Sequence, residues 1–121
     1  MKEKECNKPE EHKERVAAAK RNVPNGEKLQ KTCDLFRVLG EPSRMKIVCA
    51  LKTGELCVYH IVEACGGNQS AVSHQLRILK DNGVVRARRE GQNILYSIAD
   101  HHVYEILSVG EEHADCEISE E

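Results

Sequence analysis

The sequence has few aromatic residues and few prolines. Its 121 residues include no Trp, one Phe, three Tyr and three Pro. A chain of this length without large aromatic side chains cannot build a large core of its own. Its apolar content comes from Leu, Ile, Val and Ala, which suits helices that bury their remaining apolar surface against a second copy of the chain. We therefore expect one domain that forms a homodimer.

Long apolar segments are also missing. No stretch approaches the roughly 20 consecutive apolar residues that a membrane-spanning helix needs. The opening segment, MKEKECNKPEEHKER, contains no apolar region typical of a secretory signal. We expect a cytoplasmic protein with no membrane partner. Its six Cys are then expected to be reduced thiols, suited to metal binding or redox sensing rather than to disulfides.

Charge is unevenly distributed along the chain. The net charge is only -2 at pH 7, but the segment from Gln69 to Tyr96 carries five basic residues against two acidic ones. Residues 111–121 carry six acidic residues and no Lys or Arg. A basic centre and an acidic end place any contact with phosphate in the middle of the chain and keep the end away from DNA.

Apolar spacing and helix-breaking residues divide the chain into an arm, a domain and a tail. Residues 1–25 are polar and alternate in charge, which indicates an arm or a loosely held helix. Residues 26–117 form the expected domain, and residues 118–121 an acidic tail. The domain is predicted to be mainly α with a small β-hairpin. Its elements are helices over 27–39, from Pro42 onward, over 57–64, 70–81 and 100–116, and a hairpin over 84–98.

The helices predicted over 57–64 and 70–81 form a helix-turn-helix pattern. Gly66-Gly67 supplies a tight turn between them, and Asn68 is a good N-cap for the second helix. Three apolar residues of that second helix repeat at helical spacing and are expected to face the core. They are Val72, Leu76 and Leu79.

The opposite face of the same helix carries hydrogen-bonding side chains of modest length. They are Ser70, Ser73, His74 and Arg77. Such groups suit base edges and phosphates in a major groove, although polar faces are also common on ordinary surface helices. The following hairpin favours contact with DNA, because Arg88 and Arg89 near its tip would reach phosphates or a minor groove beside the helix.

Three segments closely resemble the ArsR/SmtB family of metal-sensing repressors. They are GEPSRMKIVCAL, GELCVYHI and NQSAVSHQLRILKDNGVVRARREGQNILYSIAD. The resemblance extends from about Leu29 to Cys116. It implies a winged helix-turn-helix that forms a homodimer through its terminal helices. It also implies that operator DNA is contacted by Gln69, Ser70, Ser73 and His74.

The last predicted helix carries four potential metal ligands, Asp100, His102, His113 and Cys116. His113 and Cys116 are three residues apart and lie on one helical face. His102 and His113 are separated by about 16 Å along the helix axis, so one chain cannot bring all four together. An antiparallel copy of the helix would place the first pair beside the partner's second pair, giving two equivalent sites per dimer.

An apolar stripe on the same helix is the expected dimer seam. It consists of Val103, Ile106, Leu107, Gly110 and Ala114.

The four ligands suit a tetrahedral zinc ion, with cobalt as a substitute in vitro. Zinc sensors of the family resemble this pattern, with Asp and His at the first two positions and His at the third, and commonly have a carboxylate at the fourth. Here the fourth position falls on Cys116, with Glu117 beside it. Either residue completes the site, and a thiolate widens the choice of ion to cadmium or lead. The alternative is that all these residues are solvated polar groups at a helix end.

A second candidate metal site lies in the GELCVYH segment. Its candidate ligands are Cys57 and His60, joined from the arm by Cys6 and His12. Relatives often carry a Cys-x-Cys pair here, but Tyr59 stands at the second Cys position, which argues against a three-thiolate arsenic site. The alternative is a buried Cys57 and a disordered arm.

These patterns predict a repressor and not an enzyme. The apo dimer is expected to bind a palindromic operator and to leave it when zinc binds. An alternative repressor of the same fold responds to thiol oxidation or persulfide, because six Cys is many for a small cytoplasmic chain. Packing is nevertheless the expected role of Cys33 and Cys49, which lie on apolar helix faces. An enzyme or a zinc-storage protein is disfavoured, because no phosphate-binding glycine loop or activated nucleophile is present.

Overall fold

The computed structural model describes residues 9–116, and the chain divides into two compact units, Met1–Cys33 and Asp34–Glu121. In the first unit, α1 (Pro9–Asn22) has no buried residue. Its exposed side chains form i,i+4 contacts such as the ion pair between Arg15 and Glu11, 3.0 Å apart. The polar first segment is therefore helical over α1, which is one of the two forms expected from the sequence.

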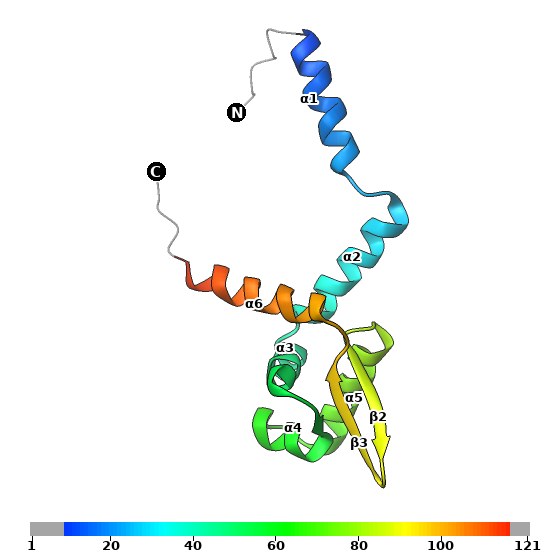
Figure 1. Cartoon of the computed structure of the whole chain (residues 1–121), viewed down its shortest axis with the longest axis vertical. Helices are drawn as coiled ribbons and strands as arrows, with labels where there is room; N and C mark the ends of the chain where they lie inside the picture. Colours follow the sequence, from blue (N-terminus) through cyan, green and yellow to red (C-terminus); the bar gives the residue numbers. More distant parts are fainter. Residues whose placement is uncertain (1–8, 117–121) are drawn as a thin grey trace. The chain divides into compact units, whose positions relative to one another are not determined.

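The second unit is a helical domain with one small sheet (Figure 1). The helix α2 spans Gly26–Leu39 and ends inside this unit. The remaining elements, in chain order, are α3 (Pro42–Ala50), the short helix η1 (Leu51–Thr53), β1 (Leu56–Cys57), α4 (Val58–Cys65), α5 (Gln69–Asp81), β2 (Val85–Glu90), β3 (Asn93–Ile98) and α6 (His101–Asp115). Within the described residues, none of the helices is long and apolar enough to span a membrane.

Side-chain caps determine where three of these helices begin. Glu41 caps α3 by accepting from the Arg44 N–H at 3.1 Å, and Pro42 occupies the first turn. Asn68 caps α5, as the sequence predicts, and Asp100 caps α6. The caps at Asn68 and Asp100 therefore set the first turns of α5 and α6, the two helices that carry most of the candidate site residues.

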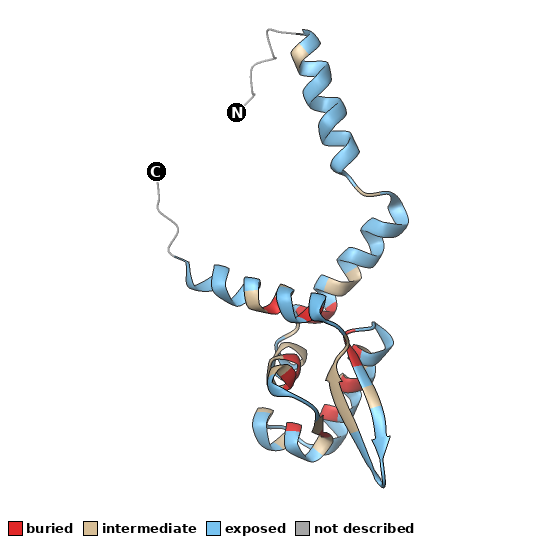
Figure 2. Ribbon diagram, in the orientation of Figure 1, coloured by how far each residue is buried: buried red, intermediate tan, exposed pale blue. Residues whose placement is uncertain are grey.

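The core lies where α3, α4 and α5 meet the sheet and one face of α6 (Figure 2). Its largest fully buried side chains are Ile47, Ile61, Leu76, Leu79, Val48 and Val84. From α6, Val103 and Leu107 are only 5% and 3% exposed and pack into this core. The chain's own core therefore covers most of the surface of these two expected seam residues, and the dimer seam stays a prediction.

The predicted hairpin is confirmed, and a third strand joins it. The strands β2 and β3 pair in antiparallel register from Val85↔Ile98 to Glu90↔Asn93. The turn between them contains Gly91 with φ +61°, a conformation that favours glycine. The two-residue strand β1 pairs with the other edge of β3, so the strand order is β1-β3-β2.

Several apolar residues remain exposed within one chain. Phe36 of α2 is 56% exposed, and Val109 of α6 is 63% exposed. Cys33 is also exposed, so its expected packing role is wrong within one chain, whereas Cys49 is half-buried. Apolar surface on both α2 and α6 is thus left uncovered by the chain itself.

Candidate DNA interface and metal ligands

The helix α5 separates an apolar face from a polar face. Its three predicted core residues are buried, with Leu76 and Leu79 fully inaccessible. The Asn68 side chain accepts a hydrogen bond from the Ala71 N–H at 2.8 Å, which stabilises the first turn. The residues predicted to contact DNA are all exposed on this helix: Gln69, Ser70, Ser73, His74 and Arg77.

A groove of about 220 Å³ lies between the start of α5 and the β2–β3 hairpin, which we call the wing. Gln69 and Ser73 line it from α5, and Gln92 and Asn93 line it from the wing. The sequence reasoning missed Gln92 and Asn93 as candidate contacts. The two-residue turn after Glu90 is the signal that could have identified them, because it places both side chains at the tip of the wing.

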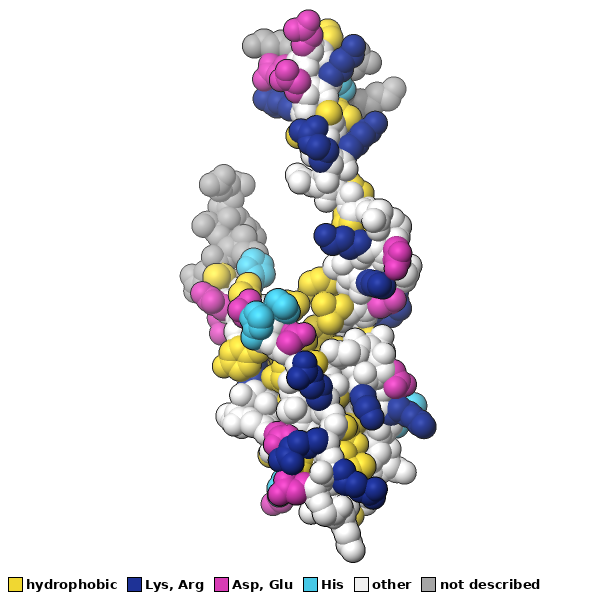
Figure 3. Space-filling model, turned by 45° about the vertical axis from the view of Figure 1, so that its right-hand side comes forward, with side chains coloured by type: hydrophobic (Ala, Val, Ile, Leu, Met, Phe, Trp, Pro, Cys, Tyr) yellow, Lys and Arg dark blue, Asp and Glu magenta, His cyan; other side chains and the backbone are white. Residues whose placement is uncertain are grey.

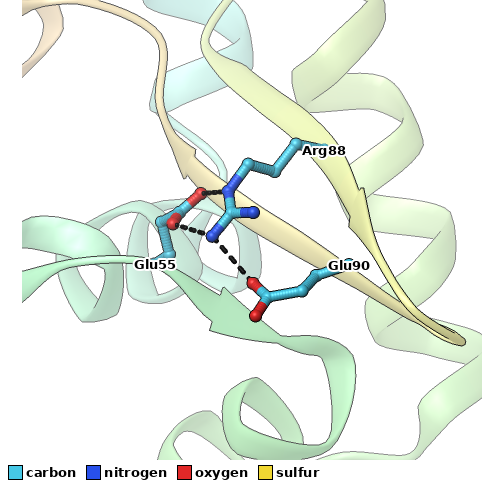
Figure 4. Close-up of polar contacts among 3 residues, drawn as sticks. All are labelled: Glu55, Arg88 and Glu90. Atoms are coloured by element: carbon cyan, nitrogen blue, oxygen red, sulfur yellow. Dashed lines mark hydrogen bonds and ion pairs between the residues drawn. The ribbon is translucent and has the colours of Figure 1, made fainter.

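The two arginines predicted at the wing differ in their surroundings. Arg88 donates from Nε and Nη2 to the Glu55 carboxylate at 2.7 and 2.8 Å, and its Nη2 lies 2.9 Å from Glu90 Oε2 (Figure 4). The Glu55 hydrogen bonds raise the pKa of the Arg88 guanidinium and lower the pKa of the Glu55 carboxyl. Both arginines are exposed, but two carboxylates, those of Glu55 and Glu90, already pair with Arg88.

The residues predicted as the first half of the zinc site, Asp100 and His102, lie at the start of α6. Asp100 Oδ1 accepts from the backbone N–H of His102 at 2.9 Å and of Val103 at 3.3 Å. The Val103 hydrogen bond is the main reason that the pKa of the Asp100 carboxyl lies below its usual value. Asp100 Oδ1 and His102 Nδ1 are 3.4 Å apart. Two ligands about 2.0–2.2 Å from one tetrahedral zinc ion are separated by roughly 3.3–3.5 Å, so this pair fits such an ion.

The second half of the predicted site lies at the other end of α6. His113 is in the last turn, and Cys116 caps the helix with extended backbone angles. The two residues stay close, because the Cys116 N–H donates to the His113 carbonyl at 3.1 Å. The two residues do not share one helical face, contrary to the expectation from the sequence, because the helix ends at Asp115 and Cys116 follows it. Glu117, the alternative fourth ligand, lies outside the described residues.

One chain does not assemble a complete metal site in the part that the structure describes. No group of three or more His, Cys, Asp or Glu side chains is placed to hold an ion among residues 9–116. Figure 3 shows histidine side chains (cyan) exposed on the surface of the molecule. The two halves at opposite ends of α6 are accessible, and the four-ligand site stays a prediction that needs a second chain.

The second candidate metal site is not assembled by α4 alone. Cys57 is 8% exposed at the N-cap of α4 and lines the groove beside the wing, whereas His60 is exposed. Cys6 lies outside the described residues. His12 is exposed on α1, in the other unit of the chain. This site stays a prediction.

Contacts of α6 with α3 and η1 link α6 to the core. Glu111 of α6 forms an ion pair with Lys52 of η1, and the Cys49 thiol donates to Glu111 Oε1 at 3.4 Å. Lys52 Nζ also lies 5.9 Å from the centre of the Tyr104 ring. Burial raises the pKa of the Cys49 thiol, and the Glu111 contact raises it further. None of these contacts was predicted from the sequence.

A second set of contacts links α3 to the predicted DNA-reading helix. Arg44 donates from Nε to the Val38 carbonyl at 2.8 Å and from Nη1 to Gln75 Oε1 at 3.2 Å. One partly buried side chain thus joins the end of α2, the start of α3 and the middle of α5. The helix α3 is therefore tied to α6 at its C-terminal end and to α5 at its N-terminal end.

An apolar groove of about 420 Å³ lies between the end of α2, α3 and α6. Phe36, Leu39 and Met45 line one side, and Ile106, Gly110 and Ala114 line the other. Four of the five expected seam residues, Ile106, Leu107, Gly110 and Ala114, therefore line the same groove as the exposed Phe36 of α2.

Comparison with known proteins places the chain among bacterial regulators. Residues 41–87 match the model of the bacterial regulatory proteins of the arsR family. The chain is 41% identical over 98 residues to a transcriptional repressor SmtB homolog of Synechocystis, covering 81% of this chain and 74% of that protein. It is 31% identical over 97 residues to a cadmium resistance regulatory protein, a CadC homolog of Staphylococcus aureus, covering 79% of each chain.

A solved structure shows the same architecture. A homodimeric winged helix-turn-helix DNA-binding domain from Mycobacterium bovis superposes with a TM-score of 0.70 at 30% sequence identity. The match covers 78% of this chain and 89% of that domain. The predicted winged helix-turn-helix fold is thereby confirmed.

Proposed function

Because this chain belongs to the ArsR/SmtB family of transcriptional regulators, we propose that it is a metal-responsive repressor that leaves its operator when zinc binds. The single observation that carries the metal part is the pairing of Asp100 with His102 at the spacing of two zinc ligands, 3.4 Å. The family consists of regulators rather than enzymes. The cytoplasmic location stays a prediction.

The DNA-binding surface of the proposal is the exposed face of α5 together with the wing. Gln69 and Ser73 line one groove with Gln92 and Asn93 of the wing, so base-edge and phosphate contacts can be made from both elements at once. Arg77 and Arg89 are exposed cations that can pair with phosphates. A homodimer would present this surface twice, which suits a palindromic operator.

The homodimer is proposed to form through α6 and the end of α2. The groove of about 420 Å³ between them is lined almost wholly by apolar side chains, and exposed apolar surface of this kind marks an interface. Homodimer formation by the similar domain from Mycobacterium bovis supports the proposal. Two α6 helices running antiparallel would align the first ligand pair of one protomer with the second pair of its partner.

The metal site of the proposal contains ligands from both protomers. Asp100 and His102 of one protomer face His113 and Cys116 of the other, giving one carboxylate, two imidazoles and one thiolate. This donor set suits zinc, with cobalt as a probe and cadmium or lead as alternative ions. Bound zinc would supply a fixed tetrahedral link between the two α6 helices.

Coupling between metal and DNA is proposed to pass through α3. Glu111, near the second ligand pair, contacts Lys52 and Cys49. Arg44, at the other end of α3, holds Gln75 of α5. A change in the packing of α6 would therefore move α3, and with it the helix that reads DNA. Metal and operator then weaken each other by the same factor, typically about 5- to 150-fold.

Fluorescence anisotropy of labelled operator DNA tests this function. The reduced dimer should bind the operator tightly with a chelator present and release it when zinc is added. His102→Ala and His113→Ala should each remove the zinc response while leaving binding by the apo protein nearly intact. Operator affinity that is unchanged at saturating zinc would refute the proposal.

The thiol-responsive alternative is weaker at two of the cysteines. Burial is the main reason that the pKa values of the Cys49 and Cys65 thiols are raised. The thiolate is the form that reacts with oxidants, so a raised pKa disfavours reaction at both positions. Loss of operator binding on treatment with peroxide or polysulfide, with no response to zinc, would favour this alternative.

A further inference from the structure

The outer half of the wing has little packing to hold it. The last three residues of β2 and the first two of β3 are exposed. The pairing of β1 with β3 reaches Leu95 but not the tip. A two-stranded ribbon without buried side chains is only marginally stable in water. Something other than core packing must therefore hold the tip beside α5.

One ion-pair cluster joins this outer half to the body of the domain. Arg88 lies on β2 opposite Leu95 of β3, and Leu95 lies opposite Cys57 of β1. The Arg88 side chain reaches Glu55, which directly precedes β1, through hydrogen bonds of 2.7 and 2.8 Å (Figure 4). Two nitrogens of the guanidinium, Nε and Nη2, thus bind both oxygens of one carboxylate, the arrangement that best fixes orientation. Arg88 also pairs with Glu90 at the end of β2.

We propose that Glu55 is a positioning residue for the wing, and that Arg88 acts on Glu55 rather than on DNA phosphate. The cluster extends to Glu90, which pairs with Asn93 across the turn. Asn93 and Gln92 line the groove that they share with Gln69 and Ser73 of α5. Holding Arg88 against Glu55 therefore fixes the distance between the wing tip and the DNA-reading helix.

The charge distribution supports this division of roles between the two arginines. Arg88 is matched by two carboxylates, so the cluster carries a net negative charge and offers no unpaired cation to a phosphate. Successive residues of a strand point to opposite faces, so Arg89 projects away from the Glu55 side. Arg89 is exposed, and it is the wing arginine suited to a phosphate.

The salt dependence of operator affinity separates these roles, in a test that rests on DNA binding but not on the metal response. Glu55→Gln and Arg88→Gln should each weaken operator binding several-fold, and the double variant no more than either one. The slope of log affinity against log salt should stay unchanged for these variants. Arg89→Gln should reduce that slope by about one, because one phosphate contact is lost.

Two controls keep the result specific to the ion pair. Glu63→Gln changes the charge equally at another exposed site and should leave affinity unchanged or slightly higher. The double variant that swaps the two charges, Glu55→Arg with Arg88→Glu, should recover operator affinity. Its backbone amides at the wing tip should also exchange hydrogen as slowly as those of the unmodified protein. An affinity that rises in Glu55→Gln, or a salt slope that falls in Arg88→Gln, would overturn the proposal. Loss of DNA binding by the unmodified protein would instead refute the proposed function.

Discussion

The cap of the DNA-reading helix gives a prediction that connects stability to function. Asn68 accepts a hydrogen bond from the Ala71 N–H at 2.8 Å. Asn68→Ala leaves that N–H without its partner and should lower the free energy of unfolding by about 1 kcal/mol, within a range of roughly 0.5–2 kcal/mol. For a domain of this size, a loss of that magnitude lowers the melting temperature by about 4–8 °C.

The same substitution should weaken operator binding. The first turn of α5 carries Gln69, Ser70 and Ser73, and it frays when its cap is lost. Circular dichroism on heating measures the stability, and fluorescence anisotropy measures the affinity. Asn68→Ser is the matched control, because serine is an equally good N-cap, and it should restore most of both losses. A melting temperature in Asn68→Ala that equals that of the unmodified protein would refute the reasoning.

Three further predictions follow from single contacts or buried residues. Leu76→Ala, at a fully buried position, should lower the free energy of unfolding by about 2–5 kcal/mol in urea titrations; a smaller change would mean that the core closes around the cavity. Glu111→Gln breaks the ion pair with Lys52, so it should reduce the effect of zinc on operator affinity and leave the zinc stoichiometry unchanged. The control Glu112→Gln should leave the effect of zinc on operator affinity unchanged. The Ser43 hydroxyl is the main cause that lowers the pKa of the Glu41 carboxyl below 4.5. The ionised Glu41 carboxylate therefore stabilises the fold fully above pH 4.5, and this stabilisation is lost as the pH falls through the lowered pKa of Glu41 in the folded state. Glu41→Gln should accordingly flatten the decline in melting temperature on acidification.

Much of the fold could be predicted from local signals. Asn68 identified the start of α5, and Val72, Leu76 and Leu79 correctly marked its buried face. The hairpin followed from alternating residues around Gly91. The strand β1 could not be predicted in this way, because two residues carry no periodic pattern and their pairing with β3 depends on a contact distant in sequence.

The candidate site was only partly predictable for similar reasons. Spacing along α6 predicted candidate ligands at its two ends, which stay a prediction, but it did not reveal that Val103 and Leu107 are buried in the chain's own core. Residue type suggested a phosphate contact for Arg88. The Glu55 carboxylate that satisfies it lies 33 residues away in sequence, so only the folded structure brings the two together.

Sharing of each metal ion between two protomers is the central claim, and zinc binding by a mixed dimer tests it most directly. One protomer carries Asp100→Ala with His102→Ala, and the other carries His113→Ala with Cys116→Ala, each with its own purification tag. Both parent homodimers lack half of every site and should bind zinc weakly. The purified heterodimer should regain one complete site and bind one zinc ion tightly. A heterodimer that binds zinc no better than its parents would contradict the account.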